Sequence, residues 1–142
     1  MLNPLVLVPV IIFFIIGFVL FRYILPKLGD WEYLAEKYKT DLDPKDGPVK
    51  KLQIRNCNIG GMGYQNAIKF YEAYNGLLLK PSWILKQSNL LIPWREIKHV
   101  QLKKNFFYKY VRLIIGDPFV SYIEISEKDY SKIKDRVEKY GH

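Results

Sequence analysis

The stretch MLNPLVLVPVIIFFIIGFVLFRYIL, residues 1–25, decides how the rest of the chain is organised. Every residue from Leu5 to Phe21 is apolar, and the first charged side chain is Arg22. As an α-helix, residues 5–25 would be about 31 Å long at about 1.5 Å per residue, and the hydrocarbon core of a bilayer is about 30 Å thick. The stretch therefore predicts one helix that crosses a membrane and keeps the rest of the chain at a membrane surface.

This apolar stretch is predicted to stay on the protein. A secretory signal has a positive start, an apolar core of about 7–15 residues and a small-x-small cleavage site. Here no Lys or Arg precedes the run, no Ala-x-Ala follows it, and Pro26 ends it. Arg22 and Lys27 lie only on its C-terminal side, so the positive-inside rule places the N-terminus outside and residues 27–142 in the cytoplasm. We expect a single-pass protein of the cell membrane.

The positive charge of the chain is concentrated in its middle. The 142 residues have a net charge of +8, and residues 44–115 alone carry 13 basic and three acidic side chains, a net of +10. Such an excess attracts anionic surfaces, although solvated sheet faces would also explain it. A nucleic acid partner is not expected, because the tethered chain has no recognisable reading motif. The single cysteine, Cys57, excludes an intramolecular disulfide and fits a reducing compartment.

Residues 29–48 are predicted to form a short amphipathic helix and a polar linker. Between Asp30 and Lys39, apolar side chains recur at helical spacing: Trp31, Leu34, Ala35 and Tyr38. This face either packs on the soluble domain or lies in the membrane interface, where Trp and Tyr are favoured. Residues 40–48, TDLDPKDGP, contain two prolines and a glycine and mark a domain boundary.

The remaining residues, 49–142, are predicted to form a mainly antiparallel β domain. Runs rich in β-branched and aromatic residues alternate with turn signals such as Asn75-Gly76. The predicted strands cover residues 49–58, 64–74, 77–80, 83–86, 90–92, 97–104, 108–115 and 119–125. A helix capped by Ser126 follows. Its apolar stripe is expected to cover one open end of a sheet and consists of Tyr130, Ile133, Val137 and Tyr140.

Short antiparallel strands followed by one C-terminal helix resemble the element order of a pleckstrin-homology-like (PH-like) barrel. DWEYLAEKY (30–38), NGLLL (75–79) and LIPWREI (91–97) are similar to segments of small bacterial membrane proteins that carry a PH-like domain. The resemblance covers residues 29–115. It implies an α+β fold, with a transmembrane helix before a PH-like barrel that ends in a helix, and a location at the bacterial inner membrane. It implies no catalytic residue.

The sequence contains no pattern typical of a catalytic, cofactor or metal site. His99 and His142 are the only histidines, so the ligand spacing of a zinc site is missing. The glycines of residues 59–63 match neither a dinucleotide-binding motif nor a P-loop and fit a turn instead. No serine lies in Gly-x-Ser-x-Gly. Trp94 is expected to plug one end of the barrel, with stacking on a ligand as the alternative. We therefore expect no enzyme and no cofactor.

One segment, KHVQLKKNFFYKYVR (98–112), is the candidate for contact with lipid or a partner. It holds five basic residues, one His, two Phe and two Tyr, and no acid. Residues 103–109 would form a hairpin tip, where exposed Phe beside Lys would suit contact with a bilayer. The alternative is that both Phe side chains point inward. The candidate residues for contact with lipid or a partner are Lys98, Lys103, Lys104, Phe106, Phe107, Lys109 and Arg112.

The sequence thus predicts an anchor (1–28), a short amphipathic helix with a linker (29–48) and a PH-like domain (49–142). The function it favours is that of a membrane-tethered, non-catalytic binding module that contacts the anionic membrane surface or a protein partner. The alternative is an accessory or assembly subunit of a larger membrane protein complex. Vesicle binding by the soluble part would favour the first, and a stable co-purifying complex the second.

Overall fold

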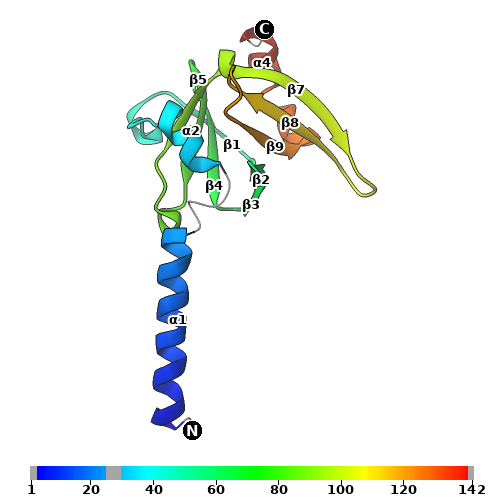
Figure 1. Cartoon of the computed structure of the whole chain (residues 1–142). Helices are drawn as coiled ribbons and strands as arrows, with labels where there is room; N and C mark the ends of the chain where they lie inside the picture. Colours follow the sequence, from blue (N-terminus) through cyan, green and yellow to red (C-terminus); the bar gives the residue numbers. More distant parts are fainter. Residues whose placement is uncertain (1–2, 25–29, 141–142) are drawn as a thin grey trace.

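The computed structural model describes residues 3–24 and 30–140 of the 142-residue chain. This part has the predicted α+β organisation, with an N-terminal apolar helix, antiparallel sheets and short helices at the C-terminal end (Figure 1). The described residues do not include Pro26 and Lys27, on which the predicted end and orientation of the span depend, or His142.

Helix α1 (Pro4–Ile24) contains the apolar stretch. Asn3 caps it, because its side-chain Oδ1 accepts a hydrogen bond from the backbone N–H of Leu5 at 3.0 Å. The segment Pro4–Arg22 has a mean hydropathy of 3.0, and none of it is buried against the rest of the protein. Its length and composition are those of a membrane span, and a signal sequence would share them. The apolar helix is confirmed, whereas its retention and its orientation stay predictions.

The strands of the described part form two antiparallel sheets. The four-stranded sheet contains, in spatial order, β1 (Lys50–Leu52), β4 (Ile68–Glu72), β5 (Gly76–Pro81) and β6 (Leu90–Pro93). The five-stranded sheet contains β3 (Met62–Gln65), β2 (Asn56–Ile59), β9 (Ser121–Ser126), β8 (Lys109–Ile115) and β7 (Ile97–Lys104).

The two sheets do not form a closed barrel. Residues 53–55 interrupt the predicted strand 49–58, so its first half pairs with β4 and its second half with β3 and β9. Asn66, at a φ of 54°, divides the predicted strand 64–74 between the two sheets in the same way. On the other side, the 3-10 helix η4 (Trp94–Glu96) separates β6 from β7. Among the described residues, no ladder joins β6 to β7, and the sheets remain open there.

The hydrophobic core lies between the two sheets and includes helix α2 (Trp31–Tyr38). Trp31, Leu34 and Tyr38 of α2 are buried in this core, so the amphipathic face packs on the β domain and does not lie in the membrane interface. Trp94 is only 2% exposed, and its indole N–H donates to the carbonyl of Ala73 at 3.1 Å. Its expected structural role is confirmed, and stacking of Trp94 on a ligand is excluded by its burial.

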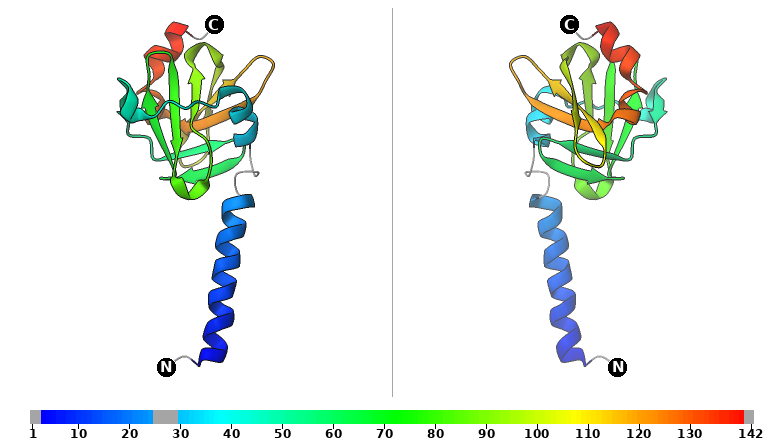
Figure 2. Two further views of the ribbon diagram at one scale, coloured as in Figure 1. Left: turned by 90° about the vertical axis from the view of Figure 1, so that its left-hand side faces the viewer. Right: turned by 90° about the vertical axis from the view of Figure 1, so that its right-hand side faces the viewer.

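The C-terminal end contains two short helices in place of the single helix expected. Ser126 caps the first of them, α3 (Glu127–Tyr130), since its Oγ accepts the N–H of Asp129 at 3.0 Å. The chain then turns and continues as α4 (Lys134–Tyr140), at the end of the domain far from α1 (Figure 2). Helix α4 contacts η4, and Ile133 and Val137 are buried, so this part of the predicted stripe covers the opening between β6 and β7. Tyr140, the last residue of the predicted stripe, is 36% exposed and does not belong to the core.

The β2–β3 turn and the β5–β6 connection both lie close to the start of α2. Gly60 and Gly61 have φ values of 59° and 93°, as expected for a tight turn between β2 and β3. A Cβ on Gly60 would lie 2.5 Å from the carboxyl carbon of Asp30, so that position also needs the absence of a side chain. The strand predicted at 83–86 is wrong: Trp83–Leu85 form a 3-10 helix, η3, which ends in the left-handed Lys86.

Candidate functional site

The β7–β8 hairpin is the candidate contact element. Its two strands pair from Ile97 to Lys104, and the hairpin reaches beyond the rest of its sheet (Figure 1). The tip is held by Asn105, whose Oδ1 accepts hydrogen bonds from the backbone N–H groups of Phe107 at 2.9 Å and Tyr108 at 3.0 Å. The backbone N–H of Asn105 also donates to the carbonyl of Tyr108 at 3.0 Å. The tip is therefore a hydrogen-bonded turn with a defined shape.

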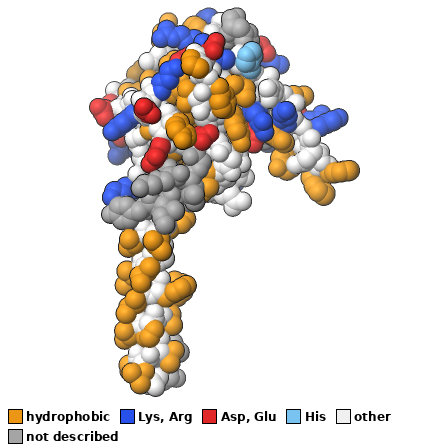
Figure 3. Space-filling view, viewed as in Figure 1, with side chains coloured by type: hydrophobic (Ala, Val, Ile, Leu, Met, Phe, Trp, Pro, Cys, Tyr) orange, Lys and Arg blue, Asp and Glu red, His pale blue; other side chains and the backbone are white. Residues whose placement is uncertain are grey.

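Both phenylalanines at the tip point into solvent. Phe106 is 100% exposed and Phe107 is 93% exposed. The alternative in which these rings point inward is therefore wrong. Burying a phenylalanine side chain stabilises a protein by about 1.5–3 kcal/mol. Neither Phe106 nor Phe107 contributes this stabilisation to the fold. Figure 3 shows hydrophobic side chains at the end of the hairpin, with Lys and Arg side chains beside them.

Three lysines surround the two rings. Lys104 lies directly opposite Lys109 across the hairpin, and Lys103 lies opposite Tyr110. Like charges in directly opposed positions destabilise an antiparallel pair. Within residues 30–140, none of the three ammonium groups has a carboxylate within ion-pair distance. The tip thus combines unneutralised positive charge with exposed aromatic surface.

The other two candidate cations are placed differently. Lys98 lies at the start of β7, with its Nζ 3.4 Å from Oε2 of Glu96. Arg112 lies within β8, and its Nε and Nη2 are each 2.8 Å from Oε2 of Glu124. Its guanidinium also lies 4.5 Å from the ring centre of Tyr122. The hydrogen bond to Glu124 raises the pKa of Arg112. Because its guanidinium is engaged by Glu124, Arg112 acts as a structural cation. The hairpin tip therefore brings together five of the seven candidate residues.

Glu96 links the hairpin base to α2. Its Oε1 lies 3.4 Å from Nζ of Lys37 and accepts a hydrogen bond from the hydroxyl of Tyr38 at 3.2 Å. Burial alone would raise the pKa of Glu96, but Lys37, Lys98 and Tyr38 outweigh burial and lower it. Burial and the Glu96 carboxylate together raise the pKa of Tyr38 to about 12. This network holds the start of β7, and with it the hairpin, against the rest of the domain.

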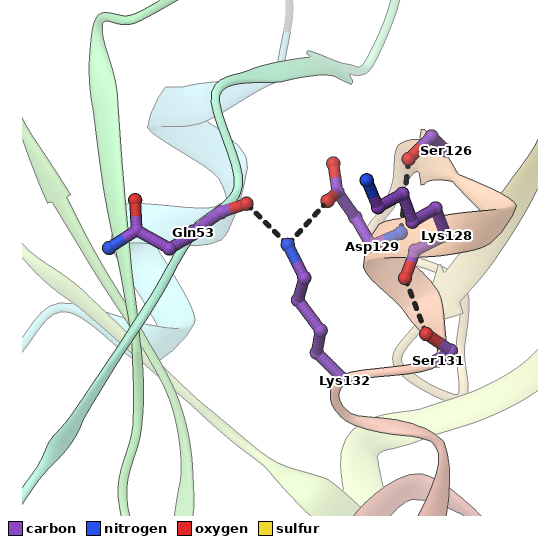
Figure 4. Close-up of polar contacts among 6 residues, drawn as sticks. All are labelled: Gln53, Ser126, Lys128, Asp129, Ser131 and Lys132. Atoms are coloured by element: carbon purple, nitrogen blue, oxygen red, sulfur yellow. Dashed lines mark hydrogen bonds and ion pairs between the residues drawn. The ribbon is translucent and has the colours of Figure 1, made fainter.

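A groove of about 1370 Å³ lies beside the hairpin tip. Its walls come from the hairpin tip, β2, β3, β9, the β1–β2 connection and α3. Because these segments are far apart along the chain, no local sequence pattern predicts the groove. Lys132 holds one wall in place, because its Nζ donates to the carbonyl of Gln53 at 2.6 Å and to Oδ1 of Asp129 at 2.9 Å (Figure 4). The lining is rich in amide and tyrosine side chains.

The wall of the groove contains one thiol, that of Cys57. Burial raises the pKa of the Cys57 thiol in its wall to about 12, so the thiol stays protonated and weakly nucleophilic. In residues 3–24 and 30–140, no group of three or more His, Cys, Asp and Glu side chains is placed to hold a metal ion. The hairpin tip remains the stronger candidate for a functional contact.

Comparison with known protein families, with curated proteins and with solved structures gave no match. The resemblance to PH-like membrane proteins therefore stays a prediction.

Proposed function

We propose that the protein is a single-pass membrane protein whose cytoplasmic, non-catalytic domain docks on the anionic surface of the membrane through the β7–β8 hairpin tip. One observation carries the proposal: Phe106 and Phe107 are almost fully exposed on a hydrogen-bonded turn flanked by Lys103, Lys104 and Lys109. Aromatic rings suit the interfacial zone of a bilayer, and ammonium groups suit anionic headgroups.

The expected strength of this contact fits a tethered domain. Each basic side chain near an anionic surface contributes about 1 kcal/mol, so the three lysines would contribute about 3 kcal/mol. That is weak for a free protein, but a tether converts docking into an intramolecular event at high effective concentration. The two rings add apolar area to the contact. The hairpin would then set the orientation of the domain, while α1 supplies the attachment.

A PH-like identity for the domain belongs to the same proposal. Two features support it: the antiparallel strands fall into two sheets that share one core, and a C-terminal helix covers the opening between them. The predicted strands 49–58 and 64–74 each contribute to both sheets, which is how a bent strand would join two sheets of a barrel-like domain.

Vesicle binding tests the proposal. The fragment 30–142 retains every side chain of the buried core and lacks α1. It should sediment with vesicles that contain anionic lipid, should not sediment with neutral vesicles, and should be released by salt. Replacing Lys103, Lys104 and Lys109 by Gln should abolish this binding, and replacing Phe106 and Phe107 by Ser should weaken it at any salt concentration.

A matched control removes the same charge elsewhere. Lys50, Lys51 and Lys69 are exposed on the four-stranded sheet, so their triple Gln variant changes the net charge equally and leaves the hairpin intact. This control should bind like the unmodified fragment. Equal loss in both triple variants would make the attraction one of net charge alone. If the fragment ignores vesicles while the full chain co-purifies with another membrane protein, the accessory-subunit alternative replaces the proposal.

A further inference from the structure

The chain contains three tryptophans, and one of them is exposed while the other two are buried. Trp31 and Trp94 are each 2% exposed, and their indole N–H groups donate to backbone carbonyls at 3.2 Å and 3.1 Å. Trp83, in η3, is 76% exposed. In the described part of the chain its indole N–H has no hydrogen-bond partner. Tryptophan is the largest apolar side chain and usually buries its ring and pairs its N–H. The exposure of Trp83 is therefore typical of a contact with something outside the domain.

The position of Trp83 relative to the anchor follows from two hydrogen bonds. The indole of Trp31, at the start of α2, donates to the carbonyl of Ser88, which lies in the same β5–β6 connection as Trp83. The hydroxyl of Ser121 donates to Oδ2 of Asp30 at 2.7 Å. The β5–β6 connection is therefore attached to the point where the chain enters the domain.

The chain length then brings this point close to the membrane. Asp30 is six residues beyond Ile24, the last residue of α1, and six extended residues span at most about 20–22 Å. Figures 1 and 2 show the β5–β6 connection at the end of the domain from which α1 extends. Tyr74, also exposed, precedes the same strand β5 and so lies at its opposite end.

We propose that Trp83 lies in the interfacial zone of the bilayer and forms a second contact, separate from the hairpin tip. The inference rests on the anchoring by α1 that the proposed function includes. Tryptophan is favoured at this depth because its ring is apolar and its N–H reaches polar headgroups. Trp83 would seat the domain next to the anchor, while Phe106 and Phe107 touch the bilayer at the far end of the hairpin.

Fluorescence quenching on the full chain tests this inference. The protein is reconstituted into vesicles whose lipids carry bromine close to the headgroup, and retention after an alkaline wash reports insertion of α1. Bromine should quench the emission of the unmodified chain, and the Trp83→Phe variant should lose that quenching, since Trp31 and Trp94 are buried. Within the Trp83→Phe background, adding Tyr74→Trp places an exposed indole at the opposite end of β5, and this indole should stay unquenched.

The outcomes separate the two contacts. Adding Phe106→Trp to the Trp83→Phe background reports the hairpin alone, so a quenched Trp83 with an unquenched position 106 would support this inference and contradict hairpin docking. The reverse result would overturn the Trp83 contact and leave the hairpin proposal intact. Equal quenching of the unmodified chain and the Trp83→Phe variant would also overturn the Trp83 contact. Loss of the chain in the alkaline wash would overturn the Trp83 contact and the hairpin proposal, because each requires α1 to span the membrane.

Discussion

Replacing Lys104 by Glu should stabilise the fold and, at the same time, weaken its binding to anionic membranes. Lys104 and Lys109 lie directly opposite each other across the hairpin. Cross-strand pairs contribute about 0.2–1 kcal/mol, with like charges unfavourable and opposite charges favourable. The substitution turns a repulsive pair into an attractive one. Because both side chains are exposed and screened by solvent, we expect a gain of about 0.5 kcal/mol in the free energy of unfolding.

Binding should change in the opposite direction. The variant loses one positive charge and gains one negative charge at the hairpin tip. At about 1 kcal/mol per unit charge near an anionic surface, the loss is about 2 kcal/mol, or about 30-fold in affinity. A change that improves the fold and damages the contact would show that the lysine pair is kept for binding.

Lys103→Glu is the matched control, because it alters the charge equally at a position opposite Tyr110. Urea unfolding of fragment 30–142 and co-sedimentation with anionic vesicles give the two readouts. Both variants should lose binding to a similar extent, and only Lys104→Glu should gain stability. A Lys104→Glu variant no more stable than Lys103→Glu would refute the argument from the opposed lysines. A stabilised variant that binds vesicles normally would refute the role of the tip.

Three further predictions concern the domain itself. Trp94→Ala should lower the free energy of unfolding by about 3–5 kcal/mol, and a variant that melts like the unmodified protein would show that Trp94 is not packed in solution. Fragment 44–142 should fold poorly in near-UV circular dichroism and fragment 30–142 well, because the shorter one lacks three core side chains, those of Trp31, Leu34 and Tyr38. Since the pKa of Glu96 is lowered in the fold, its stabilisation is present above the ordinary value of 4.5 and is lost as pH falls through the folded value. Glu96→Gln should therefore flatten the acid side of the stability profile, and an unchanged acid side would contradict the network with Lys37 and Tyr38.

Features with local signals were predictable from the sequence. The apolar run of α1, the Asn75-Gly76 turn and the Ser126 cap each depend on a few adjacent residues, and each occurs where expected. The hairpin of residues 97–115 was also predictable, because a polar and aromatic tip separates two strand-forming runs. The orientation of Phe106 and Phe107 was not, since their exposure depends on how far the hairpin reaches beyond its sheet.

Features that depend on register and packing were missed. Nothing in residues 49–58 indicates that the strand is divided between two sheets, because the division depends on partners far along the chain. The pairing of Arg112 with Glu124 requires the register of β8 with β9, so Arg112 resembled a free cation in the sequence. Residues 83–86 have strand-like composition, and only tertiary contacts made them the turn that exposes Trp83.

The two proposed contacts are connected to opposite ends of strand β9, and this separation gives them a joint effect. Ser121, at the start of β9, is hydrogen-bonded to Asp30 near the anchor, whereas Ser126, at the end of β9, pairs with Tyr110 next to the hairpin tip. Six strand residues span about 20 Å. A single contact beside the anchor would leave the domain free to rotate over the membrane surface. A second contact about 20 Å away removes most of that rotation, so one face of the domain would stay turned away from the membrane.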